Sequence, residues 1–150
     1  MKDLDPIDLR ILAALQQDAR KSNKELAEAA GVAQSTCLER IRRLEREGVL
    51  LGSHCIIEPR ALGLQLQAIL SVRLARRRRD SLAGLKSHLL ALPEALNLFH
   101  TSAGFLLHVA VRDSDHLLSF TLELGDRAEV ERVETTIVYE HVTSPLAPAG

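Results

Sequence analysis

The sequence predicts an α+β protein in which an N-terminal helix-turn-helix, in its winged form, precedes a C-terminal ferredoxin-like domain with the element order βαββαβ. Three observations lead to this prediction. A short helical pattern that ends at Gly31 is followed at once by an amphipathic, arginine-rich pattern from Gln34 to Gly48. Beyond residue 65, the patterns run strand, helix, strand, strand, helix, strand. The 150 residues, 46% of them hydrophobic, suffice for two small packed domains.

Three helices are expected in the first 48 residues. Asp5-Pro6 begins the first, with the aspartate as N-cap and the proline in the first helical position. The segment Ser22–Glu25 has the spacing of a capping box and begins the second helix, which Gly31 ends. Ala33 is a weak N-cap for the third because it has no side-chain acceptor, so either Gln34 or Ser35 is expected to compensate or this end of the helix is expected to fray.

The third helix has the chemistry of a DNA recognition helix. At about 100° per residue, its apolar face carries Cys37, Leu38, Ile41 and Leu44, and the opposite face carries hydroxyl and guanidinium groups. Such groups reach base edges and phosphates in the major groove. Taken alone, the helix fits a solvated surface helix with paired Arg and Glu equally well, and the helix-turn-helix pattern before it favours DNA. The candidate DNA-binding residues are Gln34, Ser35, Thr36, Glu39, Arg40, Arg42, Arg43 and Arg46.

The segment after the recognition helix is expected to join the two domains. Two apolar runs around Gly52-Ser53 predict a small hairpin or a single strand, which would form the wing, and Pro59 ends this pattern. The predicted domains are residues 1–60 and residues 61–143. The tail, residues 144–150, is expected to be flexible.

The C-terminal domain should form one antiparallel sheet with both helices on one face. Strands are predicted at 65–75, 95–101, 105–112 and 133–142, and helices at 80–91 and from Asp113-Ser114 onward. The other face would carry branched apolar side chains, and a second subunit is its natural cover, which predicts a homodimer. Arg76–Arg79 read as a solvated loop, with phosphate contacts as the alternative. The residues expected to point inward from the helices are Leu82, Leu85, Leu89 and Leu90, then Leu117, Leu118, Phe120, Leu122 and Leu124.

The segments L-D-P-I-D-L-R-I-L and C-L-E-R-I-R-R-L-E, with the glycine that follows, resemble the Lrp/AsnC family of bacterial and archaeal regulators. This resemblance implies dimers that often assemble into tetramers of dimers. It also implies a small effector, usually an amino acid, in a cleft between subunits near the turn between the second and third strands and the last strand. In place of the family's G-x-x-D-Y pattern the chain has Thr101, Gly104 and Phe105. The candidate effector-binding residues are His100, Thr101, Ser102, Gly104, Thr135 and Thr136, for which turn and strand packing is an equally good explanation.

Composition narrows the alternatives. Aromatic residues are 3% with no Trp, which argues against stacking on single-stranded nucleic acid, and the net charge of −1 argues against a generally basic DNA coat. Cys37 and Cys55 are expected to be small buried residues, and a cytoplasmic location fits. The six histidines lack zinc-site spacing, so no metal, cofactor or catalytic residue is expected. Two alternatives to an effector-modulated regulator remain. One is an orphan regulator or architectural DNA binder without effector, and the other, suggested by His100, is a subunit similar to siroheme decarboxylase.

Overall fold

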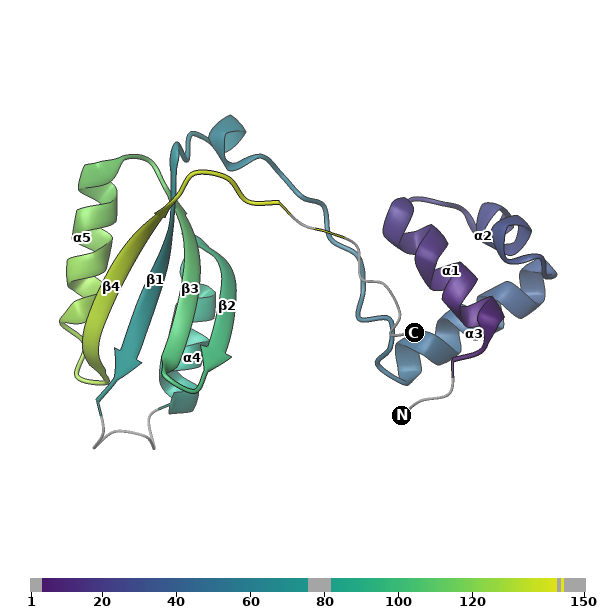
Figure 1. Cartoon of the computed structure of the whole chain (residues 1–150), viewed down its shortest axis with the longest axis horizontal. Helices are drawn as coiled ribbons and strands as arrows, with labels where there is room; N and C mark the ends of the chain where they lie inside the picture. The colour runs from purple at the N-terminus through teal and green to yellow at the C-terminus, as the bar shows by residue number, and fades with distance from the viewer. Residues whose placement is uncertain (1–3, 76–81, 143, 145–150) are drawn as a thin grey trace. The chain divides into compact units, whose positions relative to one another are not determined.

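The computed structural model describes residues 4–75, 82–142 and 144, and its elements follow the predicted order (Figure 1). The chain divides into two compact units between Ile56 and Ile57, slightly before the expected boundary at residue 60. The predicted tail, apart from Ser144, and Arg76–Arg79 lie outside the described residues. The elements are α1 (Pro6–Gln17), α2 (Asn23–Ala30), α3 (Gln34–Arg46), a 3-10 helix η1 (Pro59–Leu62), β1 (Leu66–Leu74), α4 (Leu82–Ala91), β2 (Ala95–Thr101), β3 (Gly104–Val111), α5 (Ser114–Gly125) and β4 (Val130–Val138).

The N-terminal unit is a helix-turn-helix preceded by α1, and its helices begin where the sequence predicts. The Asp5 side chain accepts hydrogen bonds from two backbone N–H groups of the first turn, and the Ser22 capping box is complete. Gly31 ends α2 in the left-handed region at φ 71°. The three helices enclose a small apolar core of Ile11, Ala14, Leu26, Ala27, Ala30 and Cys37.

The start of α3 differs from expectation in two ways. No side chain caps the helix at Ala33, so neither Gln34 nor Ser35 makes the expected compensating bond. Leu38, expected on the apolar face, is 38% exposed because Cys37 and Leu44 define the buried stripe and Leu38 lies beside it.

The predicted wing is wrong. Residues 51–58 form neither a strand nor a hairpin, because neither apolar run finds a strand to pair with in the described chain. Leu51 and Ile56 are each 89% exposed, and Cys55, expected to be buried, is exposed as well.

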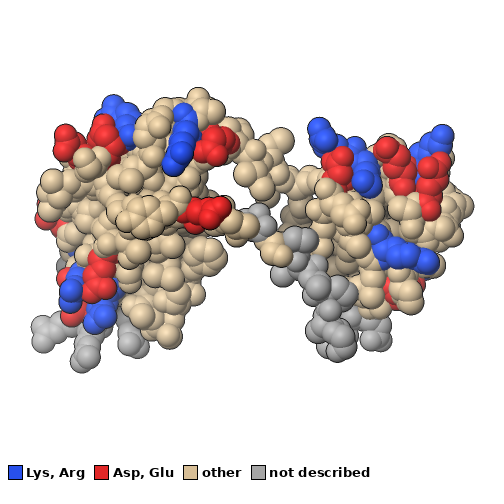
Figure 2. Space-filling view, turned by 45° about the horizontal axis from the view of Figure 1, so that its top comes forward, with Lys and Arg blue, Asp and Glu red and all other residues tan. Residues whose placement is uncertain are grey.

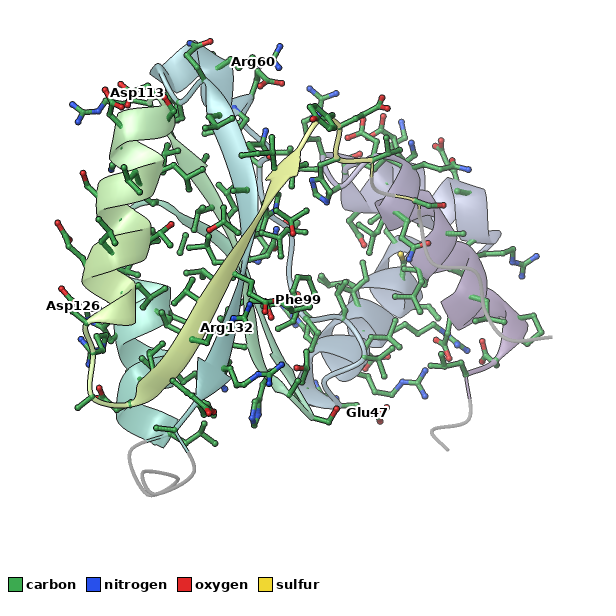
Figure 3. All side chains as sticks on the ribbon, turned by 60° about the vertical axis from the view of Figure 1, so that its left-hand side comes forward. Glu47, Arg60, Phe99, Asp113, Asp126 and Arg132 are labelled. Atoms are coloured by element: carbon green, nitrogen blue, oxygen red, sulfur yellow. The ribbon has the colours of Figure 1, made fainter. Side chains whose placement is uncertain are left out.

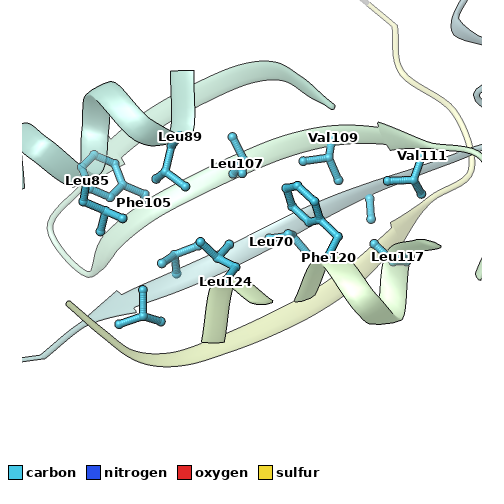
Figure 4. Packing of buried hydrophobic residues seen from close by; sticks show 13 residues of the cluster. Leu70, Leu85, Leu89, Phe105, Leu107, Val109, Val111, Leu117, Phe120 and Leu124 are labelled. Atoms are coloured by element: carbon cyan, nitrogen blue, oxygen red, sulfur yellow. The ribbon is translucent and has the colours of Figure 1, made fainter. Parts of the chain in front are cut away.

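The C-terminal unit is a four-stranded antiparallel sheet in the order β2-β3-β1-β4, as the ferredoxin-like prediction requires. Helices α4 and α5 cover one face and enclose the larger core between helix and sheet (Figures 1 and 4). Fully buried side chains from β1 and β3 form its centre, among them Leu70, Phe105 and Leu107.

Two details of this unit correct the sequence prediction. Leu90, Leu118 and Leu122 are exposed rather than inward, because the buried stripes of α4 and α5 pass through Leu85 and Leu89 and through Leu117, Phe120 and Leu124. Strand β4 runs from Val130 to Val138, three residues ahead of the predicted start, because Val130 is anchored in the core.

The sheet face away from α4 and α5, here called the open face, has no cover in the described chain. By strand alternation it carries Ile69 of β1, His108 of β3 and Thr136 of β4, which lie side by side in the register. Phe99 of β2 is on the same face and is 57% exposed (Figure 3). The face is therefore mixed, with Ile69 and Phe99 beside the polar His108 and Thr136, and not the wholly branched apolar surface that the sequence predicts for the contact with a second subunit.

Candidate nucleic-acid interface

The exposed side of α3 presents a polar stripe. Cys37 and Leu44 are completely buried on its opposite side, and Cys37 belongs to the core that α3 shares with α1 and α2. At about 100° per residue, Ser35, Glu39, Arg42 and Arg46 lie within about 60° of one another around the helix. All four are exposed, and we call them the outer stripe. Its serine hydroxyl, carboxylate and two guanidinium groups are suited to base edges and phosphates.

The N-terminus of α3 adds a second feature for binding an anion. Gln34, Ser35 and Thr36 are exposed in its first turn, which contains no acidic residue and no side-chain cap. The backbone N–H groups there point along the axis with the positive end of the helix dipole. A DNA phosphate at this end would satisfy them.

Charges on the N-terminal unit alternate in sign rather than forming a wholly basic surface. Figure 2 shows Lys and Arg interspersed with Asp and Glu on the face in view. The overall net charge of −1 agrees with this picture. Attraction to DNA must therefore come from a few well-placed cations, which makes the partners of each arginine on α3 important.

Two of the four arginines of α3 are bound to α1. Arg40 Nη1 lies 2.6 Å from Asp5 Oδ2 and 2.9 Å from Asp8 Oδ1, and Arg43 Nη2 lies 2.6 Å from Asp8 Oδ2. The Asp8 side chain is completely buried and also accepts from the Asp5 backbone N–H at 3.1 Å. We call these four residues the aspartate–arginine cluster.

The cluster keeps both aspartates ionised. Burial opposes ionisation of Asp8, but hydrogen bonds from Arg43, the Asp5 backbone and Arg40 together outweigh it, so the pKa of Asp8 lies below its usual range. The pKa of Asp5 is lowered by the Asp8 backbone N–H and by Arg40.

The structure therefore separates the eight candidate DNA-binding residues into two groups. Arg40 and Arg43 are half-buried and paired with α1, whereas the other six are exposed. The sequence contains a signal for this, since the N-cap Asp5 and Asp8 of α1 are three residues apart, about one helical turn. From the sequence, the two aspartates are explained by capping of α1 and by its helix dipole. Only the packing of α1 on α3 shows that they also bind arginines.

The candidate effector residues do not converge within one subunit. At the β2–β3 turn, Thr101 Oγ1 donates to the Gly104 carbonyl at 3.1 Å and accepts from the Ala103 N–H at 3.3 Å. The His100 ring packs on Phe105 of the core with centroids 4.9 Å apart. Thr135 Oγ1 lies 3.4 Å from Thr121 Oγ1 of α5, so Thr135 faces the helices while its neighbour Thr136 faces the opposite side of the sheet.

Gly104 has a structural role that the sequence does not reveal. Its φ is 135°, and a Cβ added there would lie 2.2 Å from the Val72 carbonyl oxygen. The close approach of β3 to β1 at this turn therefore requires glycine.

A shallow hollow of about 500 Å³ lies on the open face, where Thr136 joins Ile69, Phe99 and His108. Ser102 and the other four candidate effector residues are not among its lining residues. His108 is 5% exposed, its Nε2 lies 3.0 Å from Gln67 Oε1, and its Nδ1 lies 3.4 Å from Asn97 Nδ2. Burial lowers the pKa of His108, and the neighbouring His141 lowers it further. Sequence reasoning missed Gln67 and Asn97 because the strand register alone brings them to His108.

Metal-binding and membrane-spanning features are both absent from the described chain. It contains no group of three or more His, Cys, Asp or Glu side chains placed to hold a metal ion. None of its helices combines the length and the apolar character needed to cross a bilayer.

A helix-turn-helix with a polar outer stripe, joined to a ferredoxin-like sheet, defines a DNA-binding protein with a separate second domain. Two family models match these same units. Residues 4–45 match the AsnC-type helix-turn-helix domain, and residues 67–146 match the Lrp/AsnC ligand binding domain. The chain belongs to the Lrp/AsnC family of DNA-binding transcriptional regulators.

The similarity to known proteins covers almost the whole chain. AldR of Mycolicibacterium smegmatis, an HTH-type transcriptional regulator, is 41% identical over 97% of this chain and 88% of its own length. The leucine-responsive regulatory protein of Haemophilus influenzae is 31% identical over 88% of this chain and 73% of its own. The regulator NMB0573 of Neisseria meningitidis, solved as an L-Met complex, has a TM-score of 0.85 and 25% identity, covering 98% of this chain and 97% of its own. These relatives are regulators rather than enzymes, which removes the decarboxylase alternative.

Proposed function

We propose that the chain regulates transcription as a homodimer, built sheet to sheet, whose binding to operator DNA is modulated by an amino acid. The uncovered open face carries this proposal. Ile69 of the central strand β1 and Phe99 of the edge strand β2 are 37% and 57% exposed on a sheet whose other face carries the core under α4 and α5. A second copy that covers this face would bury both, and its symmetry would present two recognition helices to two half-sites. The site of action is then the cytoplasm, where the DNA is.

An amino acid is the effector class that the relatives favour. NMB0573 was solved with L-Met, and the matching model for residues 67–146 is a ligand-binding domain. In this chain the Thr101 hydroxyl already donates a hydrogen bond to the Gly104 carbonyl within its own turn. Thr135 and Thr136 face opposite sides of the sheet. An effector site at these residues therefore needs groups from another subunit, as a cleft between dimers in a tetramer of dimers would supply. The outer stripe, with Gln34 and Thr36, is proposed to contact the DNA.

Analytical ultracentrifugation of matched variants tests the dimer. Phe99→Arg places a charge on the open face and is expected to yield monomers at micromolar concentration, because burying an unpaired charge is strongly unfavourable. Leu118→Arg is the control, since Leu118 is equally exposed, at 59%, but lies on α5. Dimers that persist in Phe99→Arg would refute a sheet-to-sheet interface.

A thermal-shift screen against the twenty L-amino acids, with sizing chromatography, tests the effector. A ligand that binds the native state raises the melting temperature with the logarithm of its concentration. A rise with one amino acid that alters the oligomer or the affinity for DNA supports a sensing regulator. No rise with any of them would favour the orphan regulator without an amino-acid effector.

A further inference from the structure

We propose that Asp8 is a positioning residue for DNA recognition: it withdraws Arg40 and Arg43 from the phosphates and fixes the recognition helix on α1, so that the phosphate contacts of α3 fall to Arg42 and Arg46. This inference rests on DNA binding by α3. It goes further by dividing the four arginines of one helix into two that position it and two that bind.

Burial and charge support this division. Asp8 is completely buried, and a buried carboxylate must keep its hydrogen-bond donors to remain ionised. Its donors are Arg40 at 2.9 Å, Arg43 at 2.6 Å and the Asp5 N–H at 3.1 Å. The two aspartates and two arginines cancel in charge, so the cluster adds little to the attraction for DNA. Arg42 and Arg46 are exposed in the outer stripe and have no such acidic partner among the ion pairs of α1 and α3.

The geometry also fixes how α3 lies on α1. Arg40 and Arg43 are one helical turn apart, and the two oxygens of one carboxylate hold both. This bridge resists rotation of α3 about its axis as well as sliding along α1. The apolar anchors of α3 are few, with Cys37 and Leu44 as its fully buried side chains. The cluster is thus placed to set the angle at which Ser35 and Glu39 meet the bases.

The salt dependence of DNA binding separates the two roles. Two fluorescent 30-base-pair duplexes are used, one selected by the wild-type protein from a random library and one of random sequence. Each lost phosphate contact reduces the slope of log K against log salt by about 0.9. Arg42→Gln and Arg46→Gln are therefore expected to flatten this slope. Arg40→Gln and Arg43→Gln should keep the wild-type slope, yet lose about tenfold or more of the preference for the selected duplex, as expected when a base contact is misplaced.

The Asp8→Asn variant provides the complementary test. Asparagine keeps the shape but removes the charge that holds the arginines, so binding to the random duplex should strengthen and its salt slope steepen. A purely structural loss would weaken binding without a steeper slope. Circular dichroism establishes whether this variant is folded, and the four arginine variants decide the question if it is not. A slope that flattens in Arg40→Gln or Arg43→Gln as much as in Arg42→Gln would overturn the proposal. A wild-type protein that enriches no duplex from the library and does not bind the random duplex would instead refute DNA binding by α3.

Discussion

Burying an ionisable side chain is unfavourable for its charged form, and Asp8 and His108 meet this cost in opposite ways. Asp8 stays charged because two guanidinium groups and a backbone N–H surround its carboxylate. His108 stays neutral because its two ring nitrogens match one acceptor and one donor, Gln67 Oε1 and Asn97 Nδ2. Protonation of His108 would place a charge in a buried site beside the His141 ring, whose centroid is 5.1 Å away. The two sites should therefore respond to acid differently.

Acid is expected to destabilise the C-terminal unit through His108. Its folded-state pKa is lowered, so the unfolded chain binds the proton first as the pH falls. The contribution of His108 to stability is complete above its ordinary pKa of about 6.5 and is lost as the pH falls toward the folded-state value. Urea unfolding at pH 7.5 and pH 5.5 measures this difference. His108→Gln should reduce it, whereas His54→Gln, at an exposed linker position, should not.

Gly104 gives a second prediction for a single residue. Gly104→Ala adds a Cβ 2.2 Å from the Val72 carbonyl at a φ of 135°, and backbone strain with overpacking should lower the free energy of unfolding by about 2–5 kcal/mol. Gly63→Ala is the matched control, since its φ is 82° with nothing within 4 Å, and about 1 kcal/mol is expected there. Equal losses in urea unfolding would show that the contact with Val72 is unimportant.

At the scale of elements, the sequence predicted the bounds of the helices better than those of the strands. Proline, the capping boxes and Gly31 act within a few residues of themselves, so α1 begins, and α2 both begins and ends, as predicted. A strand depends on a partner that sequence pattern does not supply. The apolar runs at 49–57 have strand composition but meet no partner strand among the residues that the structure describes, whereas Val130 joins β4 because its side chain packs in the core.

The uncapped start of α3 predicts a gain in stability from one substitution. Ala33→Ser supplies a side-chain acceptor for the free N–H groups of the first turn and should stabilise the N-terminal unit by about 0.5–1 kcal/mol. Ser22→Ala should destabilise it by about 1 kcal/mol, because it removes the bonds of the capping box. Thermal unfolding measured by circular dichroism compares them, and an unchanged or lower melting temperature in Ala33→Ser would contradict the argument.

At the scale of the whole molecule, each unit has its own core. The N-terminal core centres on residues such as Ile11, and the C-terminal core on residues such as Leu107. Calorimetry should therefore resolve two transitions. Ile11→Ala and Leu107→Ala should each remove about 2–5 kcal/mol from one transition and leave the other near its wild-type position. One shared transition that shifts in both variants would show that the units unfold as a single cooperative body.

The sequence by itself determined the fold class, the element order, the helix ends and the polar face of α3, because these depend on periodicity and on groups a few residues apart. Only the tertiary structure decided which arginines of that face have partners. Asp8 and Arg43 are 35 residues apart, and their 2.6 Å contact exists because α1 packs on α3. Tertiary structure also decided that Gly104 is needed for close packing and that Thr135 and Thr136 face opposite sides. Side-chain partners across elements follow from packing and strand register, which act over distances that local patterns do not encode.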